Sequence, residues 1–498
     1  MNFDDFFRSY NEGNRRFLRE VIWDGIDIRS PIDFKHCEFV EGLHINRCKF
    51  GGIDLSGLKC EREVKITDVE CSGQFLMREA DLYRGTITKG NFQQNLDLSD
   101  SKVSQCLDIS SPSVEGTLYV SGISCREMII TGKFKQGVDG MGLISTHRFE
   151  FGGISETITL FSNSKFSNGA RFHTGPIRML TLDRSHFDGD FEIKDARLSL
   201  ASLKNVTFDS NATCTIENIS LTNKESAKLP VMNISGVIFP EYHTHIKKLK
   251  NLPVGSISFR SCKLNRVVFD SNNLGSVSLI TSSFIDAQFI NNKWGVFDER
   301  DYVIAEEIWL NRDPSEFKNS SQKELRTIIT SKTVADLYAQ YKSALETTKS
   351  YHDSGELWRN ELVNRAKYSD LATKLWIKAN GIMIGHGQRP QRCICMAIVA
   401  IILYTIIGTA IGIDVSTNDE VVLHVSFCGD FSLYALSVSI LHSLKSIFPF
   451  SYFRDYQHLT HWAILPAYEM LARILYSVLV IIWLGGALTG FRRQFKRF

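Results

Sequence analysis

A run of polar side chains interrupts an apolar stretch near the carboxyl end of the sequence, FSLYALSVSILHSLKSIFPF, residues 431–450. It holds one histidine, one lysine and five serines. Polar groups at membrane depth face water or protein, and for that reason they mark paths for ions and polar solutes. The residues that we expect to line such a path are Ser437, Ser439, His442, Ser443 and Lys445. Helix packing through small polar residues is the alternative role.

Two adjacent glycines, Gly485 and Gly486, lie within the last apolar run of the chain. Glycine lowers the stability of a helix interior by about 1 kcal/mol relative to alanine, so a bend is easier there. The two residues are therefore candidates for a gating hinge. Close packing of helices is again the alternative.

The sequence carries none of the short motifs that indicate common enzyme classes. We find no P-loop, GxGxxG, GxSxG, HExxH or deaminase signature. The histidine pair in EYHTHIKK, residues 241–248, has no second cluster of ligands beside it and is interpreted as a solvated loop. We therefore predict that the protein is not an enzyme and has no catalytic residue, no cofactor and no metal site.

The bulk composition hides two unlike parts. The chain has 498 residues and a formal net charge of +2, but most of its continuous apolar sequence lies in the last hundred or so residues. The first residues include acids and no apolar h-region, which argues against a secretory signal and favours a cytosolic amino-terminal part. Cysteines there recur in register with aliphatic residues and form no CxxC pair. We interpret them as reduced core residues: Cys37, Cys48, Cys60, Cys71, Cys125 and Cys262.

Two apolar runs, 393–413 and 474–491, are long enough to span a membrane as helices. Basic residues flank each run on the side away from the segment between them, and the chain ends in RRQFKRF. The positive-inside rule therefore predicts that both flanks are cytosolic and that the segment from 414 to about 466 lies outside.

This topology restricts the role of residues 431–448. A third full span would carry the basic end of the chain to the outside, so the simplest arrangement is span, re-entrant segment, span. Backbone that is not helical survives at membrane depth only inside protein or beside water. We therefore expect a pore helix and loop over 431–453, with an interfacial helix and a complete third span as alternatives.

The larger part of the chain carries an internal repeat. In LTLDRSHFDGDFEIKDARL, residues 180–198, apolar and small residues follow one frame that returns eleven residues later. Frames recur every ten or eleven residues from Ile45 to Val120 and again from Phe259 to Trp294. The stretches 135–178 and 210–256 are irregular. Such spacing fits short strands joined by tight corners, which predicts a solenoid of about a dozen coils.

The repeat resembles the pentapeptide-repeat family, whose unit is A(D/N)Lxx, because KDARL and READL nearly match that unit. The resemblance implies a right-handed, four-sided β-solenoid. FDDFFRSY and FLREVIW, which precede the first coil, are expected to form a helical cap over its exposed end. Some members of that family mimic DNA with a strongly acidic face, and the near-neutral charge here argues against that role.

Helical periodicity returns after the repeat. The pattern over 332–378 predicts a helical hairpin whose second helix begins near Ser354. IGHGQRPQR, residues 384–392, then breaks the helix before the first span.

The end of the chain resembles the two-span pore-loop channels, in particular those preceded by a pentapeptide-repeat domain. SGELWRNE, GHGQRPQR, the stretch 431–446 and the basic end of the second apolar run carry this resemblance. It implies a homotetramer that conducts inorganic ions. IFPFSYF replaces the potassium filter TVGYG and has no glycine, and Lys445 argues further against simple potassium selectivity if it faces the conduction path.

We therefore predict a multidomain protein with a helical cap (1–30), a pentapeptide-repeat-like β-solenoid (31–296), a helical linker (297–388) and a two-span pore domain (389–498). The expected function is an ion channel of a cell membrane, such as a bacterial inner membrane, with the solenoid and both termini cytoplasmic. A ligand or protein partner on the solenoid would regulate it, and no nucleic acid is expected to bind. The alternatives are a membrane-anchored scaffold that does not conduct and a membrane-depolarising effector, for instance in bacterial defence.

Overall fold

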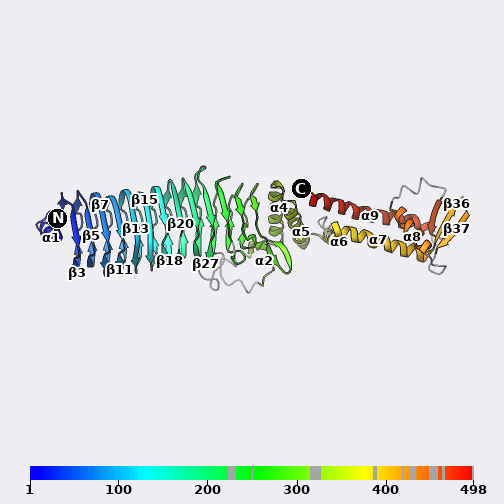
Figure 1. Cartoon of the computed structure of the whole chain (residues 1–498), viewed down its shortest axis with the longest axis horizontal. Helices are drawn as coiled ribbons and strands as arrows, with labels where there is room; N and C mark the ends of the chain where they lie inside the picture. Colours follow the sequence, from blue (N-terminus) through cyan, green and yellow to red (C-terminus); the bar gives the residue numbers. More distant parts are fainter. Residues whose placement is uncertain are drawn as a thin grey trace. The chain divides into compact units, whose positions relative to one another are not determined.

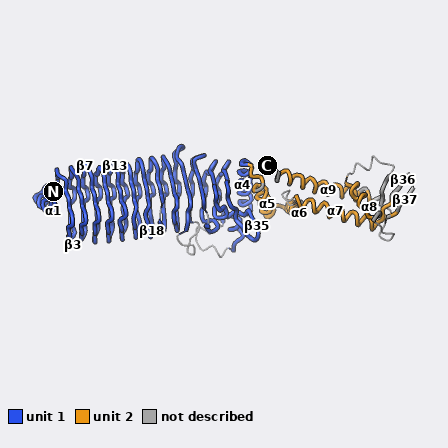
Figure 2. The backbone as a smooth tube through the Cα atoms, in the orientation of Figure 1, with its two compact units in different colours: residues 1–348 blue, residues 349–498 orange. Residues whose placement is uncertain are grey.

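The computed structural model describes residues 1–173, 175–221, 231–249, 251–313, 327–384, 390–417, 420–425, 433–447, 458–462 and 466–495. The chain divides into two compact units, Met1–Thr348 and Lys349–Phe498 (Figure 2). Unit 1 is a β-solenoid with helices at its ends. Unit 2 is helical and includes a small antiparallel sheet.

The solenoid of unit 1 covers residues 16–290 in about 13 turns (Figure 1). Each strand pairs in parallel with a strand of the next turn. Between β10 (Asp81–Thr88) and β13 (Lys102–Val114), for example, Leu82 lies opposite Val103. At the usual spacing of about 4.8 Å between strands, the stack is about 60 Å long. The predicted solenoid is confirmed.

The inward positions are those that the repeat frame predicts. Ile45, Cys48 and Phe50 are at most 2% exposed, and so are Leu180 and Leu182. All six cysteines assigned to the core are buried and free of disulfides. Burial raises the pKa of the Cys71 thiol to about 11, which keeps it protonated at neutral pH.

The corners of the coils use left-handed backbone. His36, Gly57, Glu79 and Asp100 have φ between 52° and 68° and follow one another at 21 or 22 residues. Residues other than glycine adopt this conformation at a cost, and asparagine and aspartate tolerate it best. The corners nevertheless hold histidine, glycine, glutamate and aspartate. Because no single residue type recurs at them, the sequence frame leaves these positions undefined.

The solenoid continues through the stretch 135–173, where the sequence frame is irregular. There, large aromatic residues fill the core beside glycines. A Cβ atom on Gly140 would lie 2.4 Å from the Phe161 ring, and one on Gly153 would lie 2.8 Å from Phe134. A small residue thus faces a large one, so the core volume is kept while the frame changes.

The amino-terminal cap corrects one expectation. Helix α1 (Phe3–Asn11) forms as predicted from FDDFFRSY, but FLREVIW lies in strands β1 (Arg16–Phe17) and β2 (Val21–Asp24), so the solenoid begins at residue 16. Burial alternates from Val21 to Asp24 with the period of a strand. Phe6 of α1 packs on Phe17 and Trp23, with ring centroids 4.6 and 5.1 Å away. The helix thereby covers the first turn.

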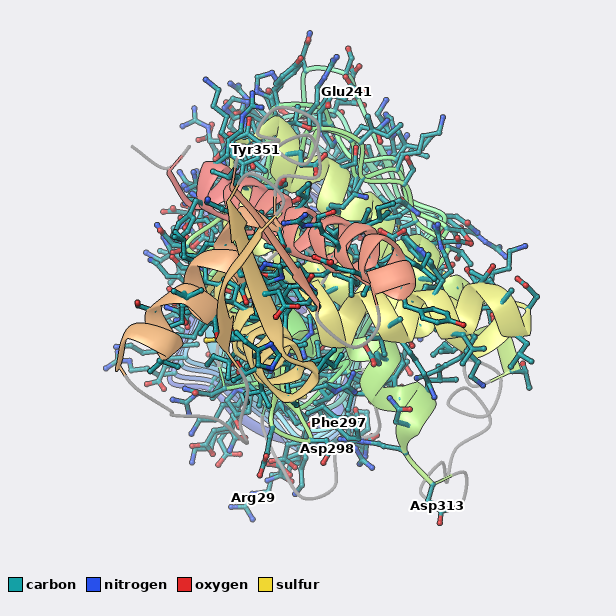
Figure 3. All side chains as sticks on the ribbon, turned by 90° about the vertical axis from the view of Figure 1, so that its right-hand side faces the viewer. Arg29, Glu241, Phe297, Asp298, Asp313 and Tyr351 are labelled. Carbon is teal, nitrogen blue, oxygen red and sulfur yellow. The ribbon has the colours of Figure 1, made fainter. Side chains whose placement is uncertain are left out.

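The other end of the solenoid is covered by a mixed cap. The region predicted as a helical linker begins instead with an antiparallel pair, β34 (Gly295–Phe297) and β35 (Arg300–Val303), and continues with α2 (Ala305–Asn311) and α4 (Ser331–Thr347). Figure 3 labels Phe297 and Asp298 at the turn of this pair. Charged side chains fringe the outside of the solenoid in the same end-on view, with Arg29 and Glu241 on opposite sides.

Unit 2 consists of α5 (Tyr351–Tyr368), α6 (Leu371–Ile384), α7 (Pro390–Ile411), α8 (Leu433–Lys445) and α9 (Pro466–Phe495). Helices α7 and α9 lie side by side (Figure 1). Both are long and apolar enough to span a membrane. The two helices predicted over 332–378 are α4 and α5, and α6 is an additional helix within that region.

A three-stranded sheet in unit 2 was not predicted. It is formed by β36 (Ile413–Thr417), β37 (Glu420–Val425) and β38 (His458–Trp462), with β36 in the centre. Strand β36 follows α7 directly, and β38 shortly precedes α9. The sheet therefore connects one end of α7 to the adjoining end of α9.

Candidate functional site

Helix α8 lies, in the order of the chain, between two strands of one sheet. Strand β37 precedes it and β38 follows it, and both strands pair with β36. With 13 residues, the helix is about 20 Å long, which is less than the roughly 30 Å of a bilayer core. The chain thus leaves the sheet, forms α8 and returns to the same sheet.

The polar face of α8 is buried against its own chain. Ser439, His442, Ser443 and Ser446 are at most 1% exposed, and their spacing places them on one side of the helix. On the outer side, Leu441 and Leu444 are 53% and 44% exposed. The apolar side of this helix therefore faces away from the protein and the polar side faces inward.

Hydroxyl groups join α8 to α7. The Oγ1 atom of Thr405 lies 2.7 Å from the Oγ atom of Ser443. One helical turn further on, Thr409 donates a hydrogen bond of 3.2 Å to Ser439. These contacts fix the rotation of α8 about its axis.

Ionisable groups join α8 to α9. Arg473 donates a hydrogen bond of 3.0 Å from Nε to the Ser446 hydroxyl. Glu469 Oε1 lies 3.9 Å from His442 Nε2, and the Tyr404 ring stacks on the His442 ring. Glu469 and Arg473 are 2% and 7% exposed, so this is a charged cluster in the interior of unit 2.

These side chains form one site, which we call the polar core. Its members come from α7, α8 and α9: Thr405, Thr409, Ser439, His442, Ser443, Ser446, Glu469 and Arg473.

The structure divides the five residues expected at an ion path. Ser439, His442 and Ser443 belong to the polar core, where they contact α7 and α9 of the same chain. Ser437 and Lys445 are exposed on α8 instead. Of IFPFSYF, only Ile447 lies among the described residues, and the rest of the expected loop falls outside them.

Sequence reasoning missed the partners of α8. Thr405 and Thr409 are four residues apart in the first apolar run, and so are Glu469 and Arg473 at the start of α9. Residues four apart share one helix face. Polar pairs at this spacing in two apolar helices were therefore the signal by which the sequence could have revealed the partners of α8. In the structure, both pairs contact α8.

The two glycines of α9 have open surroundings within this chain. The helix continues past Gly485 and Gly486 to Phe495. Gly485 is exposed, and a Cβ atom built on it would meet no atom within 4 Å. Packing within this chain therefore does not require glycine at position 485.

A second cluster fastens α4 to the end of the solenoid. The Tyr338 hydroxyl of α4 donates a hydrogen bond of 2.6 Å to Glu307 of α2, and Arg300 donates one of 3.0 Å to the same carboxylate. The ring of Tyr341 packs 5.2 Å from the ring of Phe289 in the last turn. The solenoid, α2 and α4 are thus linked through buried contacts.

Glu306 is an ionisable group enclosed by this cap. It is fully buried in α2 and accepts hydrogen bonds from the Ser278 hydroxyl and the Leu279 N–H group. Burial raises the pKa of its carboxyl, although both hydrogen bonds act in the opposite direction.

No group of three or more His, Cys, Asp or Glu side chains is gathered as for a metal ion among the residues that the structure describes. No model of a known protein family matches the chain, and no curated protein is detectably similar to it. The likeness to pentapeptide-repeat proteins and pore-loop channels therefore rests on the repeat and on the motifs quoted above.

Proposed function

We propose that the protein is an ion channel of the two-span pore-loop type, assembled from several copies of the chain and regulated by the solenoid. The observation that carries this proposal is α8, a helix too short to span, whose two connections return to one sheet between two span-length helices. In the proposed topology, the sheet lies outside the membrane and α8 is re-entrant.

The distribution of side chains in unit 2 supports a membrane location. Ile402 and Ile406 of α7 and Ile481 of α9 are 46% to 50% exposed, whereas the polar core is buried. An apolar exterior around a polar interior suits lipid as the surrounding solvent. Arg392 and Arg492 lie near the ends of α7 and α9 that are remote from the sheet, which agrees with a cytosolic position for those ends.

The conduction path would form between copies, because the polar core of each copy is filled by its own side chains. In this arrangement, the polar core positions α8 and does not conduct. Ser437 and Lys445, which are exposed on α8, become the candidates for contact with ions. A ring of lysines would favour anions over cations. The resemblance to pore-loop channels implies a homotetramer.

Regulation would reach the membrane unit through α4. A stack of parallel turns is stiff along its axis, and the Tyr338–Glu307 hydrogen bond and the Tyr341 packing attach α4 to its end. A ligand or partner that binds the solenoid can then displace α4 and bias the pore, provided that it binds the open and closed states with different affinity.

Conductance of the purified protein in a planar bilayer tests the proposal. We expect discrete current steps, with an ion preference that shifts toward cations in Lys445→Glu. Leu441→Ala, on the exposed apolar side of the same helix, is the control and should keep the preference of the wild type. Deleting residues 1–300 should abolish the response to any regulator while the membrane unit remains.

Absence of current from folded protein, also after that deletion, would contradict the channel and support the anchored scaffold. Currents that collapse the membrane potential of cells on expression would instead favour the depolarising effector, which shares the pore but differs in purpose.

A further inference from the structure

The outer surface of the solenoid has a polar hollow across three neighbouring turns. These turns contribute the paired strands β17 (Ile144–Phe151), β20 (Gly169–His173) and β23 (Asp190–Lys194). The hollow has a volume of about 310 Å³, which is at the lower end of the range for small-molecule sites. Its lining includes His147, Arg148, Asn168, Gly169, Arg171 and Asp190.

The register explains why the surface is hollowed at this place. Phe149 pairs with Ala170, and Gly169 pairs with Asp190, so Arg148, Gly169 and Asp190 occupy equivalent positions in three successive turns. Gly169 has no side chain, which leaves the space between its two neighbours open. Its φ of 142° is one that residues with a side chain rarely adopt, and a Cβ atom on it would lie 3.2 Å from the Asp190 carbonyl oxygen. The backbone therefore favours glycine here and keeps the hollow open.

The hollow has opposite charges on its two sides. Arg148 lies one turn before Gly169 and Asp190 one turn after it, so the backbones at these two residues are about 10 Å apart. Arg171 of the middle turn adds a second guanidinium group to the lining. All three charged side chains are exposed. A dissolved molecule therefore reaches two cations and one anion in one small volume.

These charged groups have contacts within the solenoid and still have bonding capacity for a ligand. Arg148 is paired with Glu150, and Arg171 with Glu192, where 3.3 Å separates Nε from the carboxylate oxygen. A guanidinium group has more N–H donors than one carboxylate occupies. The Oδ1 atom of Asp190 accepts a hydrogen bond of 2.7 Å from a threonine hydroxyl, and the carboxylate has further lone pairs.

We propose that the hollow binds a small zwitterion with one carboxylate and one protonated amine, as a free α-amino acid has. The ligand carboxylate binds Arg148 and Arg171, and its ammonium group binds Asp190. Such charge-assisted hydrogen bonds are stronger than neutral ones. An anion alone would lie near the like charge of Asp190, and a cation alone would lie near two arginines, whereas a zwitterion matches all three groups. The proposal concerns the solenoid and does not depend on the channel function.

An earlier turn supplies a matched control. Arg84 occupies the same outward position as Arg148, three turns before it, and also pairs with a glutamate, Glu63. The two arginine side chains are similarly exposed, at 55% and 51%. The equivalent residue in the turn after Arg84 is Cys106, which has a side chain, so the gap left by Gly169 has no counterpart there.

The experiment is a calorimetric titration of the purified full-length protein with each of the common α-amino acids in turn. We expect at least one of them to bind at one site per chain. Its N-acetyl derivative and its amide should each bind about tenfold more weakly or less well still, because each lacks one charge. Binding of no amino acid would overturn the proposal.

Variants assign the two charges of the ligand to the two sides of the hollow. Asp190→Asn should weaken the amino acid by about tenfold or more and leave its N-acetyl derivative nearly unaffected. Arg148→Gln should likewise weaken the amino acid and leave its amide nearly unaffected, whereas Arg84→Gln should keep the affinity of the wild type. Equal losses in Arg84→Gln and Arg148→Gln, or an equal loss for the amino acid and its N-acetyl derivative in Asp190→Asn, would contradict the site.

A measurement on the unmodified chain guards against variants that fail to fold. The bound amino acid should slow the reaction of Arg148 with phenylglyoxal, as read by mass spectrometry, and leave the reaction of Arg84 unchanged. Equal protection of both arginines, or protection of neither, would place the ligand elsewhere and overturn the proposal.

Discussion

The interiors of the two units differ in composition. In the solenoid, aliphatic and aromatic side chains fill the centre of every turn, and ion pairs such as Arg171–Glu192 lie on the outside. In unit 2, the hydroxyl and ionisable groups of the polar core are buried beside an apolar cluster that includes Val480 and Trp483, and residues such as Leu403 and Ile407 lie about half exposed on the outside. The charged exterior of the solenoid suits water, and the apolar exterior of α7 and α9 suits lipid, as the proposed membrane location requires.

Truncation of an apolar side chain should therefore have unequal effects in the two units. Phe187 is buried between the rings of Phe166 and Phe208 in the turns on either side of it. Phe187→Ala should lower the free energy of local unfolding by about 3–5 kcal/mol because it leaves a cavity. Hydrogen exchange of the full chain, followed by mass spectrometry, measures this loss.

Ile402→Ala in unit 2 is the counterpart. Ile402 is 50% exposed, so the change should cost less than about 0.5 kcal/mol in detergent. A loss as large as that of Phe187→Ala would mean that Ile402 is enclosed by protein. The apolar exterior assigned to α7 would then be wrong.

The next effect concerns the polar core. Arg473→Met removes a hydrogen bond from a buried charged group to Ser446, which should destabilise unit 2 by about 2–3 kcal/mol. Thermal unfolding in detergent measures this change. Arg492→Met, at an exposed position of the same helix, should leave the midpoint nearly unchanged. Equal shifts in both variants would show that the core does not depend on Arg473.

A smaller effect is expected for the glycine pair of α9. Replacing Gly485 and Gly486 by alanine favours the helix by about 1 kcal/mol per residue. If a bend there accompanies opening, the double variant should lower the open probability by about tenfold or more and keep the unit conductance. Single-channel recording separates the two quantities. An unchanged open probability would remove the hinge and leave the pair without a gating role.

The smallest effect is a dependence on pH in the solenoid cap. Folding raises the pKa of Glu306 above its ordinary value of 4.5, because the carboxyl is buried. The protonated carboxyl therefore contributes its stability in full below about pH 4.5, and this contribution is lost as the pH rises through the raised pKa. Glu306→Gln should thus gain stability relative to the wild type as the pH rises toward neutral.

Chemical unfolding at several pH values, monitored by hydrogen exchange in α2, measures that difference. Glu299→Gln changes an exposed carboxyl of the same cap and should parallel the wild type at every pH. A Glu306→Gln curve that also parallels the wild type would mean that Glu306 is ionised at no cost in the folded state.

The sequence was most informative where one physical rule repeats. Ile45, Cys48 and Phe50 predicted their buried positions because each coil imposes the same spacing on its neighbours. FLREVIW was assigned to the helical cap because it precedes the first coil that the frame reveals, and only pairing with the next turn shows that it is strand. The spans were predictable from length and charge.

The polar core was only half predictable. Ser439, His442 and Ser443 were recognised as polar groups in an apolar segment, but their partners Thr405 and Glu469 lie 38 and 27 residues away in sequence, on other helices. The sheet was missed for a related reason. Its strands are short and lie on both sides of α8, and their pairing is a contact between segments distant in sequence.

The orientation of unit 2 in a membrane is the point on which the account depends most directly. In intact cells that carry a Cys428→Ser background, a single cysteine at Thr417 of β36 should react with an impermeant maleimide added outside, whereas a cysteine added after Phe498 should not. This result follows if α7 and α9 span the bilayer and α8 returns to the outer side. Labelling of the carboxyl-terminal cysteine from outside would contradict the account, because the chain would then cross the membrane three times.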